Sequence, residues 1–262
     1  MRILLPVDFS TNSKVAVDFA LQLFPLQAVA SVKQENTFTL FHCAKEETEE
    51  ADKKLLLEFV TTLTSDYTFE TDFAVGNTVD QIRLSASRNE ADLVIMGIHG
   101  KLNDTQNVFG KTISTLMGNI ETPLLVVPEA HKGRLPKKII YASDLTNVNH
   151  ELHGIMWFAR LFDAEIHILH IVPEELSTQT FTDEQRDLQL ITRNLYPKIK
   201  FTPFTGTGII EGIDEFVKCE NPDLLSFYKH PGNLLQMLWD MSLAEKVSMH
   251  NHLPVLLFQK EE

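Results

Sequence analysis

Cysteine is scarce in this chain of 262 residues, where it occurs only at Cys43 and Cys219. One cysteine in each half provides no disulfide framework and no cysteine-rich zinc site. Long apolar runs are also missing, since no stretch approaches the roughly 18 consecutive apolar residues that a membrane span needs. Met1 and Arg2 lead directly into a short predicted strand and not into a secretory signal. We therefore expect a cytoplasmic protein that does not insert into membranes.

Basic residues are few relative to acidic ones. The chain has 23 Lys and Arg against 36 Asp and Glu, which gives a formal net charge of -13 at pH 7. An acidic chain without a basic stripe argues against nucleic acid or an anionic membrane surface as the main partner, because both repel it. A small anion such as a nucleotide phosphate can still be held locally by backbone dipoles.

An internal repeat decides the domain organisation. The motif ILLPVDFS around Asp8 recurs as IIYASDLT around Asp144, at an offset of 136 in the numbering. Three further pairs recur at offsets of 128, 131 and 131: His42 with His170, Asp92 with Asp223, and Pro123 with Pro254. We therefore predict two tandem domains, residues 1–130 and 137–262, joined by a short polar linker.

Each copy is predicted to alternate strands and helices. In the first copy, strands are predicted near 2–7, 37–43, 67–74, 92–96 and 123–127, and helices near 11–24, 47–64, 78–89 and 110–120. In the second copy, strands are predicted near 138–142, 165–171, 198–204, 222–227 and 254–258, and helices near 147–162, 181–194, 208–219 and 234–250. Continuous apolar strands such as Leu93–Met96 are typical of a parallel sheet covered by helices on both faces. The predicted fold class is α/β, with two doubly wound parallel-sheet domains.

Glycines punctuate the segment that follows the fourth predicted strand. Gly97, Gly100 and Gly110 have a G-x2-G-x9-G spacing, and a helix is predicted to begin near Gly110. Glycine lets backbone N–H groups approach an anion, and a helix N-terminus adds the positive end of its dipole. A doubly wound sheet binds ligands at the carboxyl ends of its strands. Because Asp8, Cys43 and Gly97 each end a predicted strand, we expect a phosphate-binding site at that edge.

Several segments together resemble the universal stress protein family. They are MRILLPVDFSTNS at 1–13, TLFHCA at 39–44, MGIHGK at 96–101, the turn at Gly110 and TPLLVVP at 122–128. Their order and spacing match that family's domain over essentially the whole first half of the chain. The resemblance implies a Rossmann-like sheet with strand order 3-2-1-4-5. From the ATP-binding branch of the family, it also implies an adenine nucleotide as ligand, ATP with or without Mg²⁺.

The resemblance further implies which residues bind the nucleotide. In the family, the end of the first strand lies beside the adenosine, and the residue after the histidine of the second strand lies against the base. The fourth strand, its loop and the next helix surround the ribose and phosphates. The corresponding residues here are Pro6, Val7, Asp8, Cys43, Met96, Gly97, His99, Gly100, Gly110, Lys111 and Thr112.

The chain departs from the family pattern after Gly110, where Lys111 replaces the usual serine or threonine and Thr112 comes second. This puts the hydroxyl donor in question, although a lysine can reach a phosphate as a point charge. Gly110-Lys111-Thr112 does not belong to a P-loop, because Thr105 stands where that motif requires glycine.

Several of these residues have simpler structural alternatives. Asp8 is also a favoured residue for capping the first helix. His42 and His170 end apolar strands, as core histidines with satisfied hydrogen bonds do. Cys43 is expected to be a small buried residue more than a reactive thiol. His99 is expected to be a loop contact, since no serine or cysteine nucleophile with an orienting partner is evident.

The second half has lost the glycines of the site. At the offset of 131, Gly97 is replaced by Tyr228, Gly100 by Pro231 and Gly110 by Met241. The larger side chains fill the space or block close approach of the backbone, and Pro231 has no N–H to donate. We therefore expect a degenerate second domain that serves as a scaffold or partner surface.

The function expected from the sequence is ATP binding in a stress-response or regulatory protein, without enzymatic turnover. One alternative is a slow ATP hydrolase or phosphotransferase, which needs a positioned base and Mg²⁺ ligands, whereas the loop offers only Asp104 and His99. Another is an interaction module that binds no nucleotide. The two domains are expected to pack as a pseudo-dimer within the chain. A homodimer through the strands near 123–127 and 254–258 stays open, and the protein partner is unknown.

Overall fold

The computed structural model describes residues 1–25, 36–63, 66–98, 111–145, 148–173, 195–229 and 253–259. The chain divides into two compact units, Met1–Gly133 and Arg134–Lys260. The break falls within the stretch 131–136, where the sequence predicts a linker. At the end of the first unit, the His131 ring lies edge-on to Phe19, with 4.4 Å between ring centroids.

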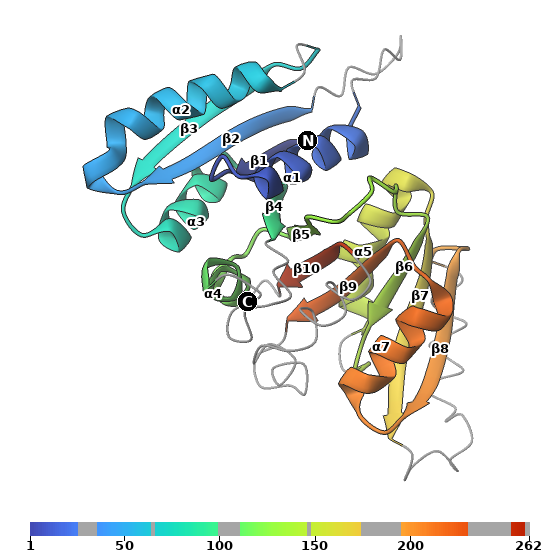
Figure 1. Ribbon diagram of the computed structural model, residues 1–262. Helices are drawn as coiled ribbons and strands as arrows, with labels where there is room; N and C mark the ends of the chain where they lie inside the picture. The colour runs from blue at the N-terminus through green and yellow to red at the C-terminus, as the bar shows by residue number, and fades with distance from the viewer. Residues whose placement is uncertain are drawn as a thin grey trace. The chain divides into compact units, whose positions relative to one another are not determined.

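The first unit is a five-stranded parallel sheet with helices between consecutive strands (Figure 1). Its strands are β1 (Arg2–Pro6), β2 (Thr37–Ala44), β3 (Phe69–Val75), β4 (Leu93–Ile98) and β5 (Leu124–Pro128). Its helices are α1 (Thr11–Leu23), the 3-10 turn η1 (Glu46–Thr48), α2 (Glu49–Thr62), α3 (Thr78–Arg88) and α4 (Lys111–Asn119). The strands pair in the order β3-β2-β1-β4-β5, and each pair is parallel. This confirms the strand order that the family resemblance implies.

Apolar burial on both faces holds this sheet between two helical layers. Ile3, Leu4 and Leu5 of β1 are at most 1% exposed, as a central strand covered on both sides requires. α1 packs on β4 and β5, α2 packs on β2 and β3, and α3 packs on β2 and against α4. Figure 1 shows α2 and α3 on opposite faces of the sheet.

The second unit repeats the arrangement. Its described elements are β6 (Lys138–Ala142), α5 (Val148–Phe162), β7 (Glu165–Pro173), β8 (Ile199–Gly206), α7 (Ile209–Glu220), β9 (Leu224–Lys229) and β10 (Val255–Gln259). The strand order is β8-β7-β6-β9-β10, again parallel throughout. The helices predicted near 181–194 and 234–250 lie outside the described residues.

The strand register supports the internal repeat. In the first unit, Ile3 of β1 pairs with Phe38 of β2, and in the second unit Ile139 of β6 pairs with Ile166 of β7. Ile3 and Ile139 are 136 residues apart, the same offset as Asp8 and Asp144. Phe38 and Ile166 are 128 residues apart, the same offset as His42 and His170. Val94 pairs with Leu124 in the first unit and Leu225 pairs with Val255 in the second, and both partners differ by the offset of 131. Each residue of the first sheet therefore has a defined counterpart in the second.

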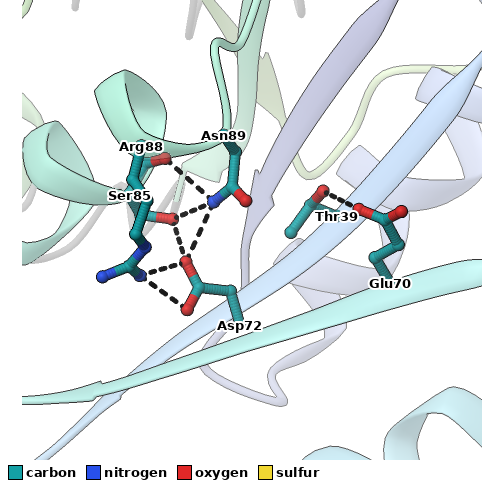
Figure 2. A network of polar contacts seen from close by, with 6 residues as sticks. All are labelled: Thr39, Glu70, Asp72, Ser85, Arg88 and Asn89. Atoms are coloured by element: carbon teal, nitrogen blue, oxygen red, sulfur yellow. Dashed lines mark hydrogen bonds and ion pairs between the residues drawn. The ribbon is translucent and has the colours of Figure 1, made fainter.

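A polar network ties the edge strand β3 to α3 (Figure 2). The Asp72 carboxylate accepts hydrogen bonds from the Arg88 guanidinium at 2.5 and 2.7 Å, from the Ser85 hydroxyl at 2.6 Å and from the Asn89 amide at 3.0 Å. Burial alone would raise the pKa of Asp72, but the hydrogen bonds from Arg88, Ser85 and Asn89 outweigh it and lower the pKa. The network fixes α3 against β3 behind the turn that leads to the site.

One predicted boundary is wrong in a way that matters for the site. The sequence predicts the fourth strand near 92–96, with Gly97 at its end as the first of the three spaced glycines. In the structure β4 continues to Ile98, and Gly97 pairs within the sheet with Val127 of β5. Gly97 is therefore not needed for a loop conformation, and its role must come from what lies against it.

Candidate functional site

A cavity of about 410 Å³ opens at the carboxyl ends of β1, β2 and β4 in the first unit. It is lined by Pro6, Val7, Asp8, Ser10, Asn12, Ser13, Phe41, His42, Cys43, Thr78, Ile82, Met96, Gly97, Thr112 and Ile113. The expectation that Asp8, Cys43 and Gly97 gather at one edge of the sheet is confirmed. Pro6, Val7, Met96 and Thr112, which the family resemblance adds, line the same cavity.

The turn from β1 to α1 forms one wall and contains Asp8. The Oδ1 atom of Asp8 accepts hydrogen bonds from the Ser10 N–H at 3.1 Å, from the Ser10 hydroxyl and from the Ser13 hydroxyl at 2.5 Å. The Asp8 N–H donates in return to the Ser13 hydroxyl at 3.0 Å. Ser10 is the N-cap of α1, since its side chain accepts from the Ser13 N–H. Asp8 is thus not the cap itself, and it orders the residues that make the cap.

His42 lies behind this turn at the end of β2. Its side chain is buried, with Nδ1 2.7 Å from the Val7 carbonyl oxygen. Its ring stacks on Phe9, with 4.3 Å between centroids, and its Nε2 lies 3.5 Å from an Asp52 carboxylate oxygen. The prediction of a core histidine with satisfied hydrogen bonds is confirmed for His42. His170 makes the corresponding contact, with its Nδ1 3.0 Å from the Ser143 carbonyl oxygen, but its side chain is only half-buried, so the prediction of a core position is wrong for His170.

Cys43 and the β3–α3 turn form the opposite wall. The Cys43 thiol donates to the Gly76 carbonyl oxygen, with 3.5 Å between sulfur and oxygen. Burial raises the pKa of this thiol, and hydrogen bonds with Thr78 and the Gly76 backbone only partly offset that rise. The thiol form therefore prevails at neutral pH. The expectation of a small buried residue is met only in part, because Cys43 is half-buried and lines the cavity, whereas its raised pKa agrees with the expectation that it is not a reactive thiol.

Gly97 allows α1 to begin directly against β4. A Cβ atom built on Gly97 would lie 2.3 Å from the Asn12 carbonyl oxygen and 2.6 Å from the Asn12 carbonyl carbon. Both are backbone atoms, so no side-chain rearrangement can make room. Only glycine lets the first turn of α1 approach the strand end this closely, which brings the β1–α1 turn and β4 to the same cavity.

The first turn of the fourth helix forms a further part of the cavity lining. α4 begins at Lys111, close to the predicted start at Gly110, and Thr112 and Ile113 of its first turn line the cavity. Helix N-termini present unpaired N–H groups that bind anions. His99, Gly100, Gly110 and the Lys111 side chain lie outside the described residues.

Sequence reasoning missed several lining residues, of which Ser10, Asn12, Ser13 and Thr78 carry polar groups. Ser10 had a readable signal, since a serine directly before an apolar helical pattern is a favoured N-cap. Asn12 and Ser13 lie inside the first turn of α1 and are at most 5% exposed, which no local pattern indicates. Thr78 reaches the cavity only because β3 lies at the far side of β2.

In the second unit, side chains occupy the corresponding strand ends. Tyr228, the counterpart of Gly97, is 7% exposed and stacks on Phe258, with 5.2 Å between ring centroids. A Cβ atom built on Gly154 of α5 would lie 3.0 Å from the Tyr228 hydroxyl. The prediction that the tyrosine side chain fills the space at this strand end, where the first unit has Gly97, is therefore confirmed. Pro231 and Met241 lie outside the described residues.

Beside Tyr228, the second unit has a buried polar cluster. The Glu151 carboxylate of α5 accepts hydrogen bonds from the Tyr141 hydroxyl and, at 3.3 Å, from the Ser143 hydroxyl. Burial, and then the neighbouring Glu151 carboxylate, raise the pKa of Tyr141 well above its ordinary value. Tyr141 corresponds to the apolar Leu5 of the first unit, so the two units have different interiors at this edge.

Two further findings concern the described part of the chain. It contains no group of three or more His, Cys, Asp or Glu side chains placed to hold a metal ion. No helix within those residues is both long enough and apolar enough to cross a membrane.

Comparison with known proteins places this site in a family context. Residues 1–128 match the Universal stress protein family. No curated protein matches the sequence. The structure is similar to that of a universal stress protein from Archaeoglobus fulgidus DSM 4304, with a TM-score of 0.73 and 14% identity over 100% of this chain and 97% of that one.

Two other solved structures are similar at low identity. A functionally unknown protein from Pseudomonas aeruginosa PAO1 gives a TM-score of 0.66 and 16% identity over 98% of this chain and 92% of that one. A universal stress protein in complex with cAMP gives 0.38 and 18% over 50% of this chain and 98% of that one. The matches over 98–100% of this chain show that both units lie within a fold already seen in solved structures. The first unit of this chain belongs to the universal stress protein family.

Proposed function

We propose that the first unit binds an adenine nucleotide, ATP, in the cavity at the ends of β1, β2 and β4, and that the protein acts in stress response or regulation through this binding. The observation that carries the proposal is the close approach of Asn12 to Gly97. It brings the start of α1 to the end of β4, beside one cavity lined by Pro6, Val7, Asp8, Cys43, Met96, Gly97 and Thr112, all carried over from the family's nucleotide site. Membership of the universal stress protein family supports the regulatory part.

The chemistry of the described lining suits a nucleotide. Met96 and the half-buried Cys43 offer apolar surface for a base, whereas Asp8 and Thr78 offer polar groups for base edges and ribose hydroxyls. The N-terminal turn of α4, which begins at Lys111, suits a phosphate. Asp8 is the only carboxylate among the lining residues that the structure describes, so a Mg²⁺ ion would be bound mainly by the phosphates and water.

The first test is mass spectrometry of the freshly purified, denatured protein. Bound ATP supports the proposal, a bound diphosphate favours an ATP hydrolase, and the absence of any nucleotide favours an interaction module. Isothermal titration with ATP then measures affinity, with cAMP as a second probe because it is the ligand in the complex named above. No heat of binding at millimolar ATP would overturn the proposal.

We predict that turnover is negligible, far below the roughly 1–100 s⁻¹ of kinases. Hydrolysis needs a group that positions the attacking water, and the Oδ1 atom of Asp8 is already engaged by Ser10 and Ser13. Phosphate release is followed over hours with ATP and Mg²⁺. A steady rate that His99→Ala or Asp104→Ala abolishes would make the protein an enzyme.

A further inference from the structure

His42 fixes the backbone from which Asp8 projects. Its Nδ1 atom lies 2.7 Å from the Val7 carbonyl oxygen, and a carbonyl oxygen only accepts, so Nδ1 carries the proton of this hydrogen bond. The Val7 N–H donates to the Phe41 carbonyl oxygen at 2.8 Å. Both polar groups of the Val7 backbone are therefore bound to β2, immediately before Asp8.

Beyond Asp8, the chain passes through a strained residue that also rests on His42. Phe9 has φ of 62°, in the left-handed region that bulky residues avoid at a cost of about 1–2 kcal/mol. Its ring stacks on the imidazole at 4.3 Å with an angle of 29° between the planes, and Phe59 of α2 lies 5.8 Å away. The imidazole thus holds the residues on both sides of Asp8.

The position of the imidazole is itself supported from α2. Its Nε2 atom faces Asp52 at 3.5 Å, and the same Asp52 oxygen accepts the Thr48 hydroxyl at 2.6 Å. A chain of contacts therefore runs from the start of α2 through Asp52 and His42 to the cavity wall. A core histidine with satisfied hydrogen bonds would need only the contact with the Val7 carbonyl oxygen.

We propose that His42 is a positioning residue of the nucleotide site, which acts by holding the turn Val7–Phe9 so that the Asp8 carboxylate faces the cavity. The nucleotide part of this proposal rests on the proposed function. The positioning of the turn does not, because it depends only on contacts within the first unit.

The second unit supplies a matched control. His170 makes the corresponding bond to the Ser143 carbonyl oxygen at 3.0 Å, and Leu145, the counterpart of Phe9, has φ of 67°. Leu145 has no aromatic ring to stack on the imidazole, and Tyr228 occupies the neighbouring strand end. Loss of His170 therefore removes the same hydrogen bond from the fold without touching the cavity.

The experiment compares His42→Leu, His42→Asn and His170→Leu with the wild type by isothermal titration with ATP. His42→Leu removes the donor and is expected to weaken binding about tenfold. His42→Asn places an amide N–H near the Nδ1 position and should restore most of the affinity. His170→Leu should leave affinity unchanged, although both leucine variants lower the melting temperature. Unchanged affinity in His42→Leu, or an equal loss in His170→Leu, overturns the proposal.

A measurement without nucleotide separates this proposal from the proposed function. Hydrogen exchange at the Asp8 and Ser13 amides, which depend on the β1–α1 turn, should be at least tenfold faster in His42→Leu and unchanged in His170→Leu. Imidazole ¹⁵N spectra of the wild type should show His42 protonated at Nδ1. If exchange responds but wild type binds no ATP, positioning stands and nucleotide binding fails. Unchanged exchange, or an Nδ1 atom without a proton, overturns the positioning role.

Discussion

Gly97 shows how one missing side chain decides the geometry of the site. The sequence marks it as a glycine at the end of a strand, and that much predicts its place at the cavity. The reason for glycine could not be predicted, because it lies in the carbonyl group of Asn12, which is distant in the sequence and yet 2.3 Å from the missing Cβ. Contacts of this kind depend on how α1 packs on β4, which no local pattern encodes.

The residue-scale prediction concerns Gly97→Ala. The added methyl group displaces the first turn of α1 from β4, and we expect a loss of about 1–3 kcal/mol in the free energy of unfolding, typical of overpacking. ATP binding should weaken, because the same shift moves Ser13 and Asp8 away from the strand end. Denaturant unfolding and isothermal titration measure the two effects.

Gly208→Ala is the control for this prediction. Its Cβ atom would meet only the flexible Glu211 carboxylate, and its backbone is extended at φ of −163°. Glycine is a better N-cap residue than alanine, so this variant should lose about 0.5–1 kcal/mol and stay less destabilised than Gly97→Ala. Equal destabilisation by both alanine variants would show that close packing at Gly97 is not what the site requires.

At the scale of elements, the sequence predicts the order and type of strands and helices well where apolar runs are continuous. β1, with Ile3 to Leu5 buried, and β5 lie within one residue of their predicted bounds. Ends are less predictable, because a strand stops where pairing stops. β4 continues through Gly97 since β5 offers Val127 and Pro128 as partners. The polar residues of the cavity wall lie at such ends, so the sequence predicts only some of them.

The Asp72 network that joins β3 to α3 leads to a prediction about pH. The pKa of Asp72 is lowered in the folded protein, so the unfolded chain binds its proton more readily. The network therefore stabilises the fold fully above the unfolded pKa of about 3.9, and this stabilisation is lost as pH falls through the lower folded pKa. Asp72→Asn should reduce the free energy of unfolding at pH 7 by about 1 kcal/mol. The expected loss is small because the Arg88 side chain is 57% exposed, so solvent screens its ion pair with Asp72.

The deficit of Asp72→Asn relative to wild type should shrink below pH 4 in urea unfolding followed by circular dichroism. Glu70→Gln is the control in the same strand, since the bond from Thr39 to Glu70 is long, at 3.5 Å (Figure 2). This control should differ from wild type by less than about 0.5 kcal/mol. A deficit of Asp72→Asn that is constant from pH 7 to pH 3 would contradict the role of the carboxylate charge.

At the scale of the whole molecule, the sequence predicts the repeat clearly. It predicts only part of the difference between the two units. The similar offsets between the paired motifs, from 128 to 136, predict two copies of one sheet, and the strand register reproduces them. Loss of the glycines predicts that the second unit lacks a phosphate loop. The buried cluster of Tyr141, Ser143 and Glu151 could not be predicted, because these residues meet only when α5 packs on β6.

This asymmetry predicts one nucleotide per chain, although Asp8 and Asp144 follow corresponding strands. In the first unit, Gly97 lets the start of α1 lie against the strand end beside an open cavity, whereas in the second unit Tyr228 stands at the equivalent position and stacks on Phe258. Asp8→Asn should therefore weaken ATP binding by about 1–3 kcal/mol, the scale of a hydrogen bond that involves a charged group. Asp144→Asn should leave affinity unchanged and affect only stability. Isothermal titration of wild type and both variants tests this, and a stoichiometry near two, or equal losses in the two variants, would show that the second unit also binds nucleotide despite Tyr228.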